Sequence, residues 1–209
     1  MKRYVLVILA AVLAAPSAAR ADDVYADPND PGRVTRVHHG VSELDLGALG
    51  VLTHVSSGDT TSTQISTTIS GRYQYFLLDN LSLGAEGIFA YDKEGDATHA
   101  NSLGGTLFGS FHLRLGLGAF LRPTLALGAL FGTRDTDTGV GGVVLEESQS
   151  AFLTRLQLPF AYFASQRVVL QAGPELDILA GSFTPSGGGT STSFTEVVGG
   201  FSVAVGYAF

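Results

Sequence analysis

The feature that most constrains this chain is the alternation of side-chain size in its last nine residues, 201–209. Large apolar or aromatic side chains take every odd position: Phe201, Val203, Val205, Tyr207 and Phe209. The even positions between them hold Ser, Ala, Gly and Ala. Because successive side chains of a strand point to opposite faces, these residues predict a strand with one bulky and one small face. The bulky face suits lipid, and the small face suits a crowded barrel interior.

The same alternation recurs along the chain in eight segments. They lie at about residues 43–54, 63–77, 81–91, 103–115, 124–131, 152–162, 168–178 and 196–209. Their connections alternate between long polar loops and short turns such as Asp79-Asn80, as in membrane barrels with short periplasmic turns and long outer loops. The sequence therefore predicts an all-β fold, a transmembrane up-and-down antiparallel β-barrel of eight strands, over residues 41–209.

The first of these strands has an uncertain phase. Leu44 and Leu46 face one way, but Leu49 and Val51 fall on the polar side. A bulge near Gly47 or Gly50 would restore the phase, and we expect one there.

The amino-terminal residues predict export. Lys2 and Arg3 precede a short apolar run that ends near Pro16, and Ala19-Arg20-Ala21 has the form of a cleavage site. We expect residues 1–21 to be a secretory signal peptide, residues 22–40 a flexible periplasmic lead-in segment, and the barrel to follow. The apolar run is too short to span a bilayer as a helix.

The composition narrows the class of protein. A formal net charge of −7 argues against a nucleic-acid partner, and removal of the basic signal peptide makes the chain more acidic still. The 27 glycines and the charged fraction of 15% are unusual for a soluble secreted protein, which covers its surface with charge. There is no cysteine, so no disulfide framework is expected.

Alternation alone does not show which face of the barrel wall contacts water, because the strands of a soluble ligand-binding barrel also alternate between apolar and polar residues. The polar face carries sparse charges of both signs, which is typical of a packed interior with paired charges. The predicted lumen charge network comprises Glu43, Asp45, Arg72, Glu86, His112, Arg114, Arg155, Glu175, Asp177 and Glu196. The outward aromatic residues fall into two belts, Tyr73, Tyr75, Phe160, Tyr162, Tyr207 and Phe209 near the turns and Phe89, Tyr91, Phe131 and Phe152 near the loops. Two aromatic belts favour a membrane barrel.

On these residues the chain resembles the small eight-stranded outer-membrane β-barrel family, of the OmpA-barrel and OmpX type. The resemblance rests on the signal peptide, the strand pattern and the terminal strand Phe201, Val203, Val205, Tyr207 and Phe209. It implies a location in the outer membrane after removal of the signal peptide. It also implies contact with outer-membrane lipid and lipopolysaccharide, and recognition of the terminal strand by the barrel-assembly machinery.

Three short motifs resemble parts of catalytic or metal sites. His54-Val55-Ser56 has the His-x-Ser spacing of outer-membrane lipid A deacylases, but it lies on the first strand and has no evident carboxylate beside it. Residues 135–146 echo a calcium loop, with Val140 where glycine is required. The adjacent His38 and His39 lack a second set of ligands. We therefore expect no catalytic residue, no cofactor and no metal site, and we expect His112 to be a hydrogen-bonded interior histidine.

The function predicted from the sequence is that of an integral outer-membrane barrel with a structural or surface-interaction role. Its polar lumen is expected to be plugged, since an eight-stranded interior is just filled by side chains. Its acidic and Gly/Ser/Thr-rich loops are expected to be exposed outside the cell. The alternatives are a lipid A-modifying enzyme and a narrow pore for small solutes. A pore would require a continuous wet path through the lumen.

Overall fold

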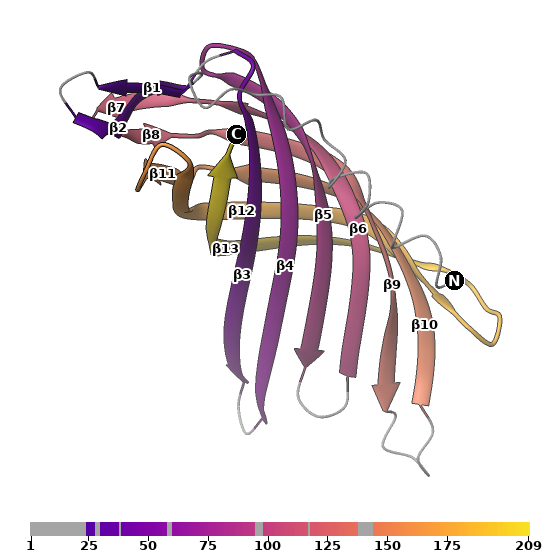
Figure 1. Ribbon diagram of the computed structural model, residues 1–209. Coiled ribbons are helices and arrows are strands. Elements are labelled where there is room, and N and C mark those ends of the chain that lie inside the picture. The colour runs from indigo at the N-terminus through magenta and orange to yellow at the C-terminus, as the bar shows by residue number, and fades with distance from the viewer. Residues whose placement is uncertain are drawn as a thin grey trace.

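The computed structural model describes residues 24–27, 30–37, 39–57, 60–94, 98–116, 118–137 and 144–209. Eight long strands in this part of the chain pair in a closed antiparallel ring (Figure 1). In ring order they are β3 (Ser42–Ser57), β4 (Thr60–Leu78), β5 (Leu81–Glu94), β6 (Thr98–Phe111), β9 (Thr124–Asp137), β10 (Val144–Gln157), β12 (Val168–Pro185) and β13 (Thr192–Ala208). The pairing of β13 with β3 closes the ring, so the predicted eight-stranded barrel is confirmed.

Three short strands continue long ones at the end where both termini of the barrel lie. They are β7 (Leu113–Gly116), β8 (Ala119–Leu121) and β11 (Phe160–Phe163). Each is separated from its long strand by a break, and the breaks lie side by side: the Arg122 amide donates to the Pro159 carbonyl at 2.9 Å, and the Leu158 amide to the Pro174 carbonyl at 3.1 Å. Proline has no amide hydrogen, which explains the breaks at Pro123 and Pro159, whereas the break between β6 and β7 falls at His112.

The segment before the barrel departs from expectation. Residues 22–40 were predicted to be a flexible lead-in, but the structure has a hairpin there, formed by β1 (Val24–Asp27) and β2 (Asp30–Val37). It forms a sheet of its own, separate from the barrel. The predicted signal peptide lies outside the described residues and stays a prediction.

The strands are longer, and the outer loops shorter, than predicted. Residues 133–137 and 144–149, predicted to be loop, belong to β9 and β10, and much of 181–195 belongs to β12 and β13. These extensions are rich in Gly, Ser, Thr and Asp, so they lack the alternation that a lipid-facing strand shows. At the opposite end the tight turn at Asp79-Asn80 is as predicted, with Asn80 at a φ of 69°.

No bulge interrupts the first strand, so the predicted bulge near Gly47 or Gly50 is wrong. β3 pairs with β4 in unbroken register from Ser42 to Ser57. Leu46 is 68% exposed on the outer wall, whereas Leu49 is 7% exposed and turns inward. At Leu49 the apparent loss of phase is therefore an apolar side chain that packs in the lumen; the side chain of Val51 lies outside the described part of the chain.

The seam between β13 and β3 is paired over only half its length. Seven pairs join the two strands, from Ala208 opposite Glu43 to Ser202 opposite Leu49. Every other neighbouring pair in the ring shares between 11 and 16 residue pairs. Beyond Leu49 and Ser202 the β3–β4 and β12–β13 hairpins diverge (Figure 1). We call this unpaired stretch, Gly50–Ser57 of β3 and Thr192–Phe201 of β13, the open seam.

The outer wall of the barrel is apolar all round. Exposed leucines, valines and aromatic residues occur on every long strand whose side chains are described, among them Ile69, Leu83, Leu107, Leu127, Phe152, Leu176 and Val205. The aromatic residues predicted to face outward are exposed or half-buried. Among the described residues, no helix is long and apolar enough to cross a bilayer.

Candidate functional site in the barrel lumen

The charged side chains of the barrel lie in its lumen, on the inward-facing positions of the alternation. Seven of the ten residues of the predicted lumen network are buried there: Glu43, Asp45, Arg72, Glu86, Arg155, Glu175 and Asp177. The last five are joined by ion pairs, whereas Glu43 and Asp45 are linked to each other through the side-chain amide of Gln171. The seven residues come from β3, β4, β5, β10 and β12, so the network joins opposite walls of the barrel.

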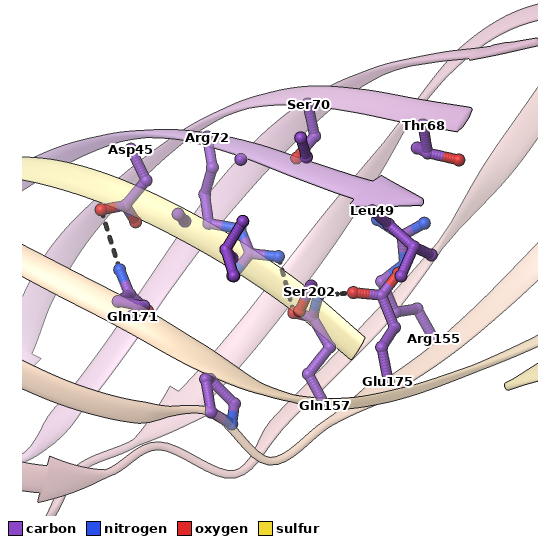
Figure 2. A pocket seen from close by; sticks show the side chains of 15 residues that line it. Asp45, Leu49, Thr68, Ser70, Arg72, Arg155, Gln157, Gln171, Glu175 and Ser202 are labelled. Atoms are coloured by element: carbon purple, nitrogen blue, oxygen red, sulfur yellow. Dashed lines mark hydrogen bonds and ion pairs between the residues drawn. The ribbon is translucent and has the colours of Figure 1, made fainter. Parts of the chain in front are cut away.

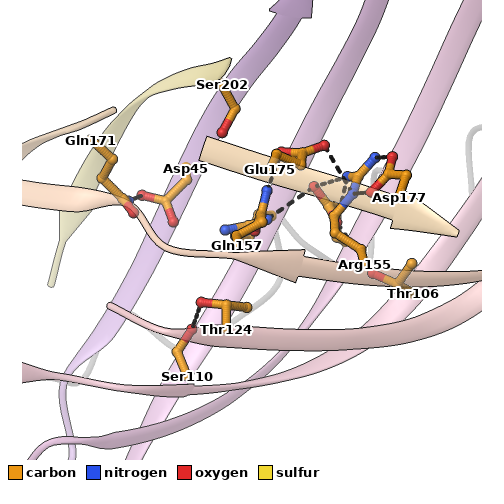
Figure 3. A network of polar contacts seen from close by, with 12 residues as sticks. Asp45, Thr106, Ser110, Thr124, Arg155, Gln157, Gln171, Glu175, Asp177 and Ser202 are labelled. Atoms are coloured by element: carbon orange, nitrogen blue, oxygen red, sulfur yellow. Dashed lines mark hydrogen bonds and ion pairs between the residues drawn. The ribbon is translucent and has the colours of Figure 1, made fainter. Parts of the chain in front are cut away.

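Arg155 is the centre of this network (Figure 3). Its Nε and Nη2 atoms donate to the two carboxylate oxygens of Asp177 at 2.8 and 2.7 Å. Its Nη1 donates to both oxygens of Glu86 at 3.2 Å, and its Nε lies 3.0 Å from Glu175 Oε1. One guanidinium therefore holds three carboxylates, using the planar donor geometry that suits bidentate pairing.

A second arginine links this centre to the neighbouring strands. Arg72 Nη2 donates to Glu86 Oε1 at 3.2 Å and to Gln157 Oε1 at 2.6 Å. The Gln157 amide in turn donates to Glu175. The guanidinium of Arg72 also lies over the ring of Phe108, 4.8 Å from its centroid. Buried charges are stable only when paired and hydrogen-bonded, and Arg72 meets both conditions.

The third arginine of the lumen, Arg122, is one that the sequence analysis missed. It forms a bidentate ion pair with Glu43, with Nη2 3.1 Å from Oε2. Glu43 Oε1 also accepts from the amides of Gln74 at 2.8 Å and Gln171 at 3.2 Å. Residues 116–122 were predicted to be a turn, which hid the fact that Arg122 shares the inward phase of Thr124.

A serine and a histidine meet in the lumen, but not in the arrangement of a nucleophile and its base. His112 Nε2 and Ser82 Oγ are 2.9 Å apart, and Ser82 donates its hydroxyl hydrogen to Gln74 Oε1 at 2.7 Å. Since Ser82 has one hydrogen and gives it to Gln74, His112 must donate to Ser82 rather than accept from it. His112 Nδ1 has no hydrogen-bond partner, so no carboxylate orients the ring, and both residues are fully buried. A hydrolase requires the opposite proton direction and access for the substrate.

Two apolar layers enclose the charged layer. Toward the loop end, Ile88, Leu153 and Leu179 each lie two positions from a network residue of the same strand, and they pack with Leu130. At the turn end, the second layer comprises Val41, Phe76, Phe120, Ala161, Phe163, Val169 and Ala208. Within the described residues, the lumen thus runs from apolar to charged to apolar.

A small cavity of about 30 Å³ lies between the charged layer and the paired end of the seam (Figure 2). Its walls include Leu49 and Ser202, the last pair of the seam, together with Asp45 and Glu175. Asp45 Oδ1 accepts from Gln171 Nε2 at 2.9 Å, whereas Asp45 Oδ2 has no hydrogen-bond partner. The space is that of one or two water molecules and not of a substrate.

The small face of the terminal strand makes room for this arrangement. Gly206 lies opposite Asp45 across the seam, and a Cβ atom at Gly206 would collide with the Asp45 carboxylate. The alternation of large and small residues in β13 therefore has a definite cause, because its small residues leave space for the charged side chains of the lumen.

The structure places the other three residues of the predicted network differently. His112 is buried beside Ser82 and carries no ion pair in the structure as described. Arg114 is exposed in β7, where it lies opposite Phe120 of β8, so it does not belong to the buried lumen network. Glu196 is exposed near the extracellular mouth, where its charged neighbours are Asp92 and Arg134. Both residues share the inward phase, but the side chain of each is exposed.

Among the described residues, no catalytic or metal site forms around the three motifs that resemble such sites in the sequence. His54 and Ser56 lie in β3, but their side chains are outside what the structure describes, as are His38, Gly139 and Val140. Asp135 and Glu146 are opposite each other in the β9–β10 ladder. In the described part of the chain, no three acidic, histidine or cysteine side chains cluster as metal ligands would.

Solved barrels resemble this one in outline. The translocator domain of autotransporter NalP from Neisseria meningitidis superposes with a TM-score of 0.49 and 12% identity, over 81% of this chain and 88% of that one. Neisserial surface protein A gives a TM-score of 0.48 and 17% identity, over 81% and 97% of the two chains. The outer membrane protein OprG from Pseudomonas aeruginosa gives 0.48 and 14%, over 82% and 97%. No protein-family model matches the chain, and no curated protein matches it either.

The architecture itself decides the class. In lipid, every backbone polar group of a spanning segment needs a partner, which leaves only helices and closed barrels. A ring of antiparallel strands with an apolar outer wall and buried, paired charges in its lumen is the form of outer-membrane proteins. The chain is an eight-stranded antiparallel β-barrel of the outer membrane, as the alternation in its sequence predicts.

Proposed function

We propose that this protein is a non-conducting, non-enzymatic barrel with a structural or surface-interaction role in the outer membrane. The observation that supports this best is the enclosed lumen. Three arginines and five carboxylates are bonded across it, and an apolar layer lies on each side of them. Ions and small solutes would have to cross two apolar layers, which oppose any continuous wet path.

The part of the barrel that can meet a partner is its extracellular extension. A tilted strand needs about 9–11 residues to cross the membrane, whereas β4 has 19 and β12 has 18. The surplus projects beyond the lipid as a polar wall. On β9, β12 and β13 it carries a stacked pair, Phe183 and Phe194, with Arg134 over the Phe183 ring at 5.2 Å. A projecting wall of paired strands supports a role in contact with the cell's surroundings.

Conductance separates this role from that of a pore. The purified protein, inserted in a planar lipid bilayer, is expected to give no steady current under applied voltage, because the lumen has no wet path. A general porin inserted in the same bilayer shows that the measurement detects an open barrel. Regular, reproducible channel steps from the protein would overturn the proposal.

The partners proposed for the barrel itself are outer-membrane lipid and lipopolysaccharide on its wall, and the barrel-assembly machinery at its terminal strand. Support comes from the exposed apolar face of β13, with Phe201, Val203 and Val205 all more than half exposed. In membrane fractions the mature chain is expected to resist extraction and to change its gel mobility on heating. A freely soluble mature protein would contradict the proposal.

A further inference from the structure

The open seam leaves two strand edges without partners. Within the described chain, β13 pairs with β12 along its full length but with β3 only from Ser202 to Ala208. β3 likewise pairs with β4 up to Ser57 but with β13 only as far as Leu49. Each edge therefore presents a row of unpaired backbone N–H and C=O groups, which is a template for strand addition.

Part of the open seam lies at the depth of the lipid. The paired half starts beside Tyr207, in the aromatic belt at the turn end. Seven residues of a strand tilted by about 45° cover roughly 17 Å of membrane depth, whereas the apolar band of such a barrel is about 25 Å tall. Pairing thus stops before the band ends, and Phe201, the first unpaired residue of β13, is 59% exposed with an apolar side chain. Unpaired backbone groups in hydrocarbon cost several kcal/mol each, so this part of the edge requires a partner.

We propose that the partner is a second copy of this chain, and that the two copies close each other's open seam. In this arrangement the free edge of β13 in each copy pairs with the free edge of β3 in the other, around a twofold axis along the membrane normal. β13 and β3 run antiparallel within one copy, and rotation about that axis keeps them antiparallel between copies. The outer faces of both barrels stay toward lipid.

Two features favour a second copy over other occupants. A lipid chain has no donors and acceptors to match a backbone edge, so the occupant must be an extended polypeptide. A single foreign strand would run antiparallel to one edge and parallel to the other, and it would add to a seam whose two sides are already complementary. Reciprocal pairing of two copies satisfies all four edges with segments that this chain supplies, and it closes without leaving an edge free.

The absence of cysteine allows a direct test by disulfide formation. Continued in register from Leu49 opposite Ser202, the seam would place Val51 opposite Gly200. Cα atoms of such a pair are roughly 5 Å apart, within the range that a disulfide bridges. The mature protein with Val51→Cys and the mature protein with Gly200→Cys are refolded together in phosphatidylcholine vesicles and oxidised. We expect a covalent species of twice the monomer mass, well above the amount from either variant alone.

A matched pair in the closed half gives the control. Ala48 lies opposite Val203 within one copy, so Ala48→Cys mixed with Val203→Cys should give no dimer, while the double variant should form its disulfide within the monomer. The decisive comparison is the double variant Val51→Cys/Gly200→Cys. If it oxidises within the monomer, the seam closes by itself and the proposal is wrong. Failure of the mixed single variants to crosslink, with the control double variant oxidised, would overturn it equally.

Discussion

At the scale of single residues, the main feature of the lumen is that one guanidinium group pairs with several carboxylates. Arg155 contacts Glu86, Glu175 and Asp177, and Glu86 also accepts from Arg72. Replacing a complete buried ion pair by apolar groups can be neutral, but removing one partner leaves the others charged and unpaired in a closed space. The stability of the barrel should therefore depend on Arg155 more than on any exposed charge.

Arg155→Met tests this dependence. The substitution keeps much of the side-chain volume but leaves Glu175 and Asp177 without a guanidinium and Glu86 with Arg72 alone, so we expect a loss of about 3–5 kcal/mol in the free energy of unfolding. The measurement is urea-induced unfolding of the protein in lipid vesicles, followed by the heat-dependent gel shift. Arg114→Met is the matched control: Arg114 is exposed, and the change should stay within about 0.5 kcal/mol of the native protein. Equal effects of the two substitutions would contradict the assignment of Arg155.

Residue by residue, the alternation predicts which way a side chain points but not where the lumen ends. It placed Arg72, Glu86 and Arg155 inward, where the structure has them. It failed for Arg114, which shares the inward phase but is exposed at the turn end of the barrel. The alternation also missed Arg122, although Arg122 lies two residues before Thr124 and therefore on the same face of the strand. Which partners meet across the barrel depends on contacts far apart in sequence, such as Arg122 with Glu43, 79 residues away.

At the scale of strands, the difference between prediction and structure lies in the parts outside the lipid. Alternation of apolar and polar residues arises where one face of a strand meets lipid and the other meets the lumen. Beyond the lipid both faces are wet, so β9, β10, β12 and β13 continue as strands with no such signal. Two breaks, between β6 and β7 and between β10 and β11, fall inside predicted strands and lacked a clear signal, although Pro159 marks the second of them.

The apolar band should be measurable on β6 and β10, the two strands that flank β9 in the wall. Leu107 of β6 is 73% exposed within the band, and Leu145 of β10 is 44% exposed in the extracellular extension. Leu107→Arg is expected to destabilise the barrel by about 2–4 kcal/mol, since arginine near the membrane midplane meets hydrocarbon, while Leu145→Arg should cost only about 0–1 kcal/mol. Unfolding of both variants in the same vesicles gives the comparison. A larger cost at Leu145 would mean that the barrel sits at a different depth.

At the scale of the whole molecule, the number of strands and their order could be predicted, and the closure of the ring could not be predicted in detail. The closing strands β3 and β13 stand at opposite ends of the barrel sequence, and no local pattern reports how far two distant strands remain paired. The expected difficulty at this seam was a bulge in β3, whereas the structure has regular strands that separate after seven pairs.

The enclosure of the charged layer between two apolar layers also bears on the kinetics of unfolding. Arg72, Arg122 and Arg155 can exchange carboxylates only while the wall is open to water, so their pairing must be completed as the ring closes. In the closed barrel, the first step of unfolding has to expose charges and apolar layers together, and its rate should be very low. We therefore expect hysteresis, with the urea midpoint for unfolding above that for refolding at equal times. The gap should narrow in Arg155→Met, whose lumen holds one ion-pair centre fewer. Coincident curves for the native protein would mean that water enters the lumen without opening the wall.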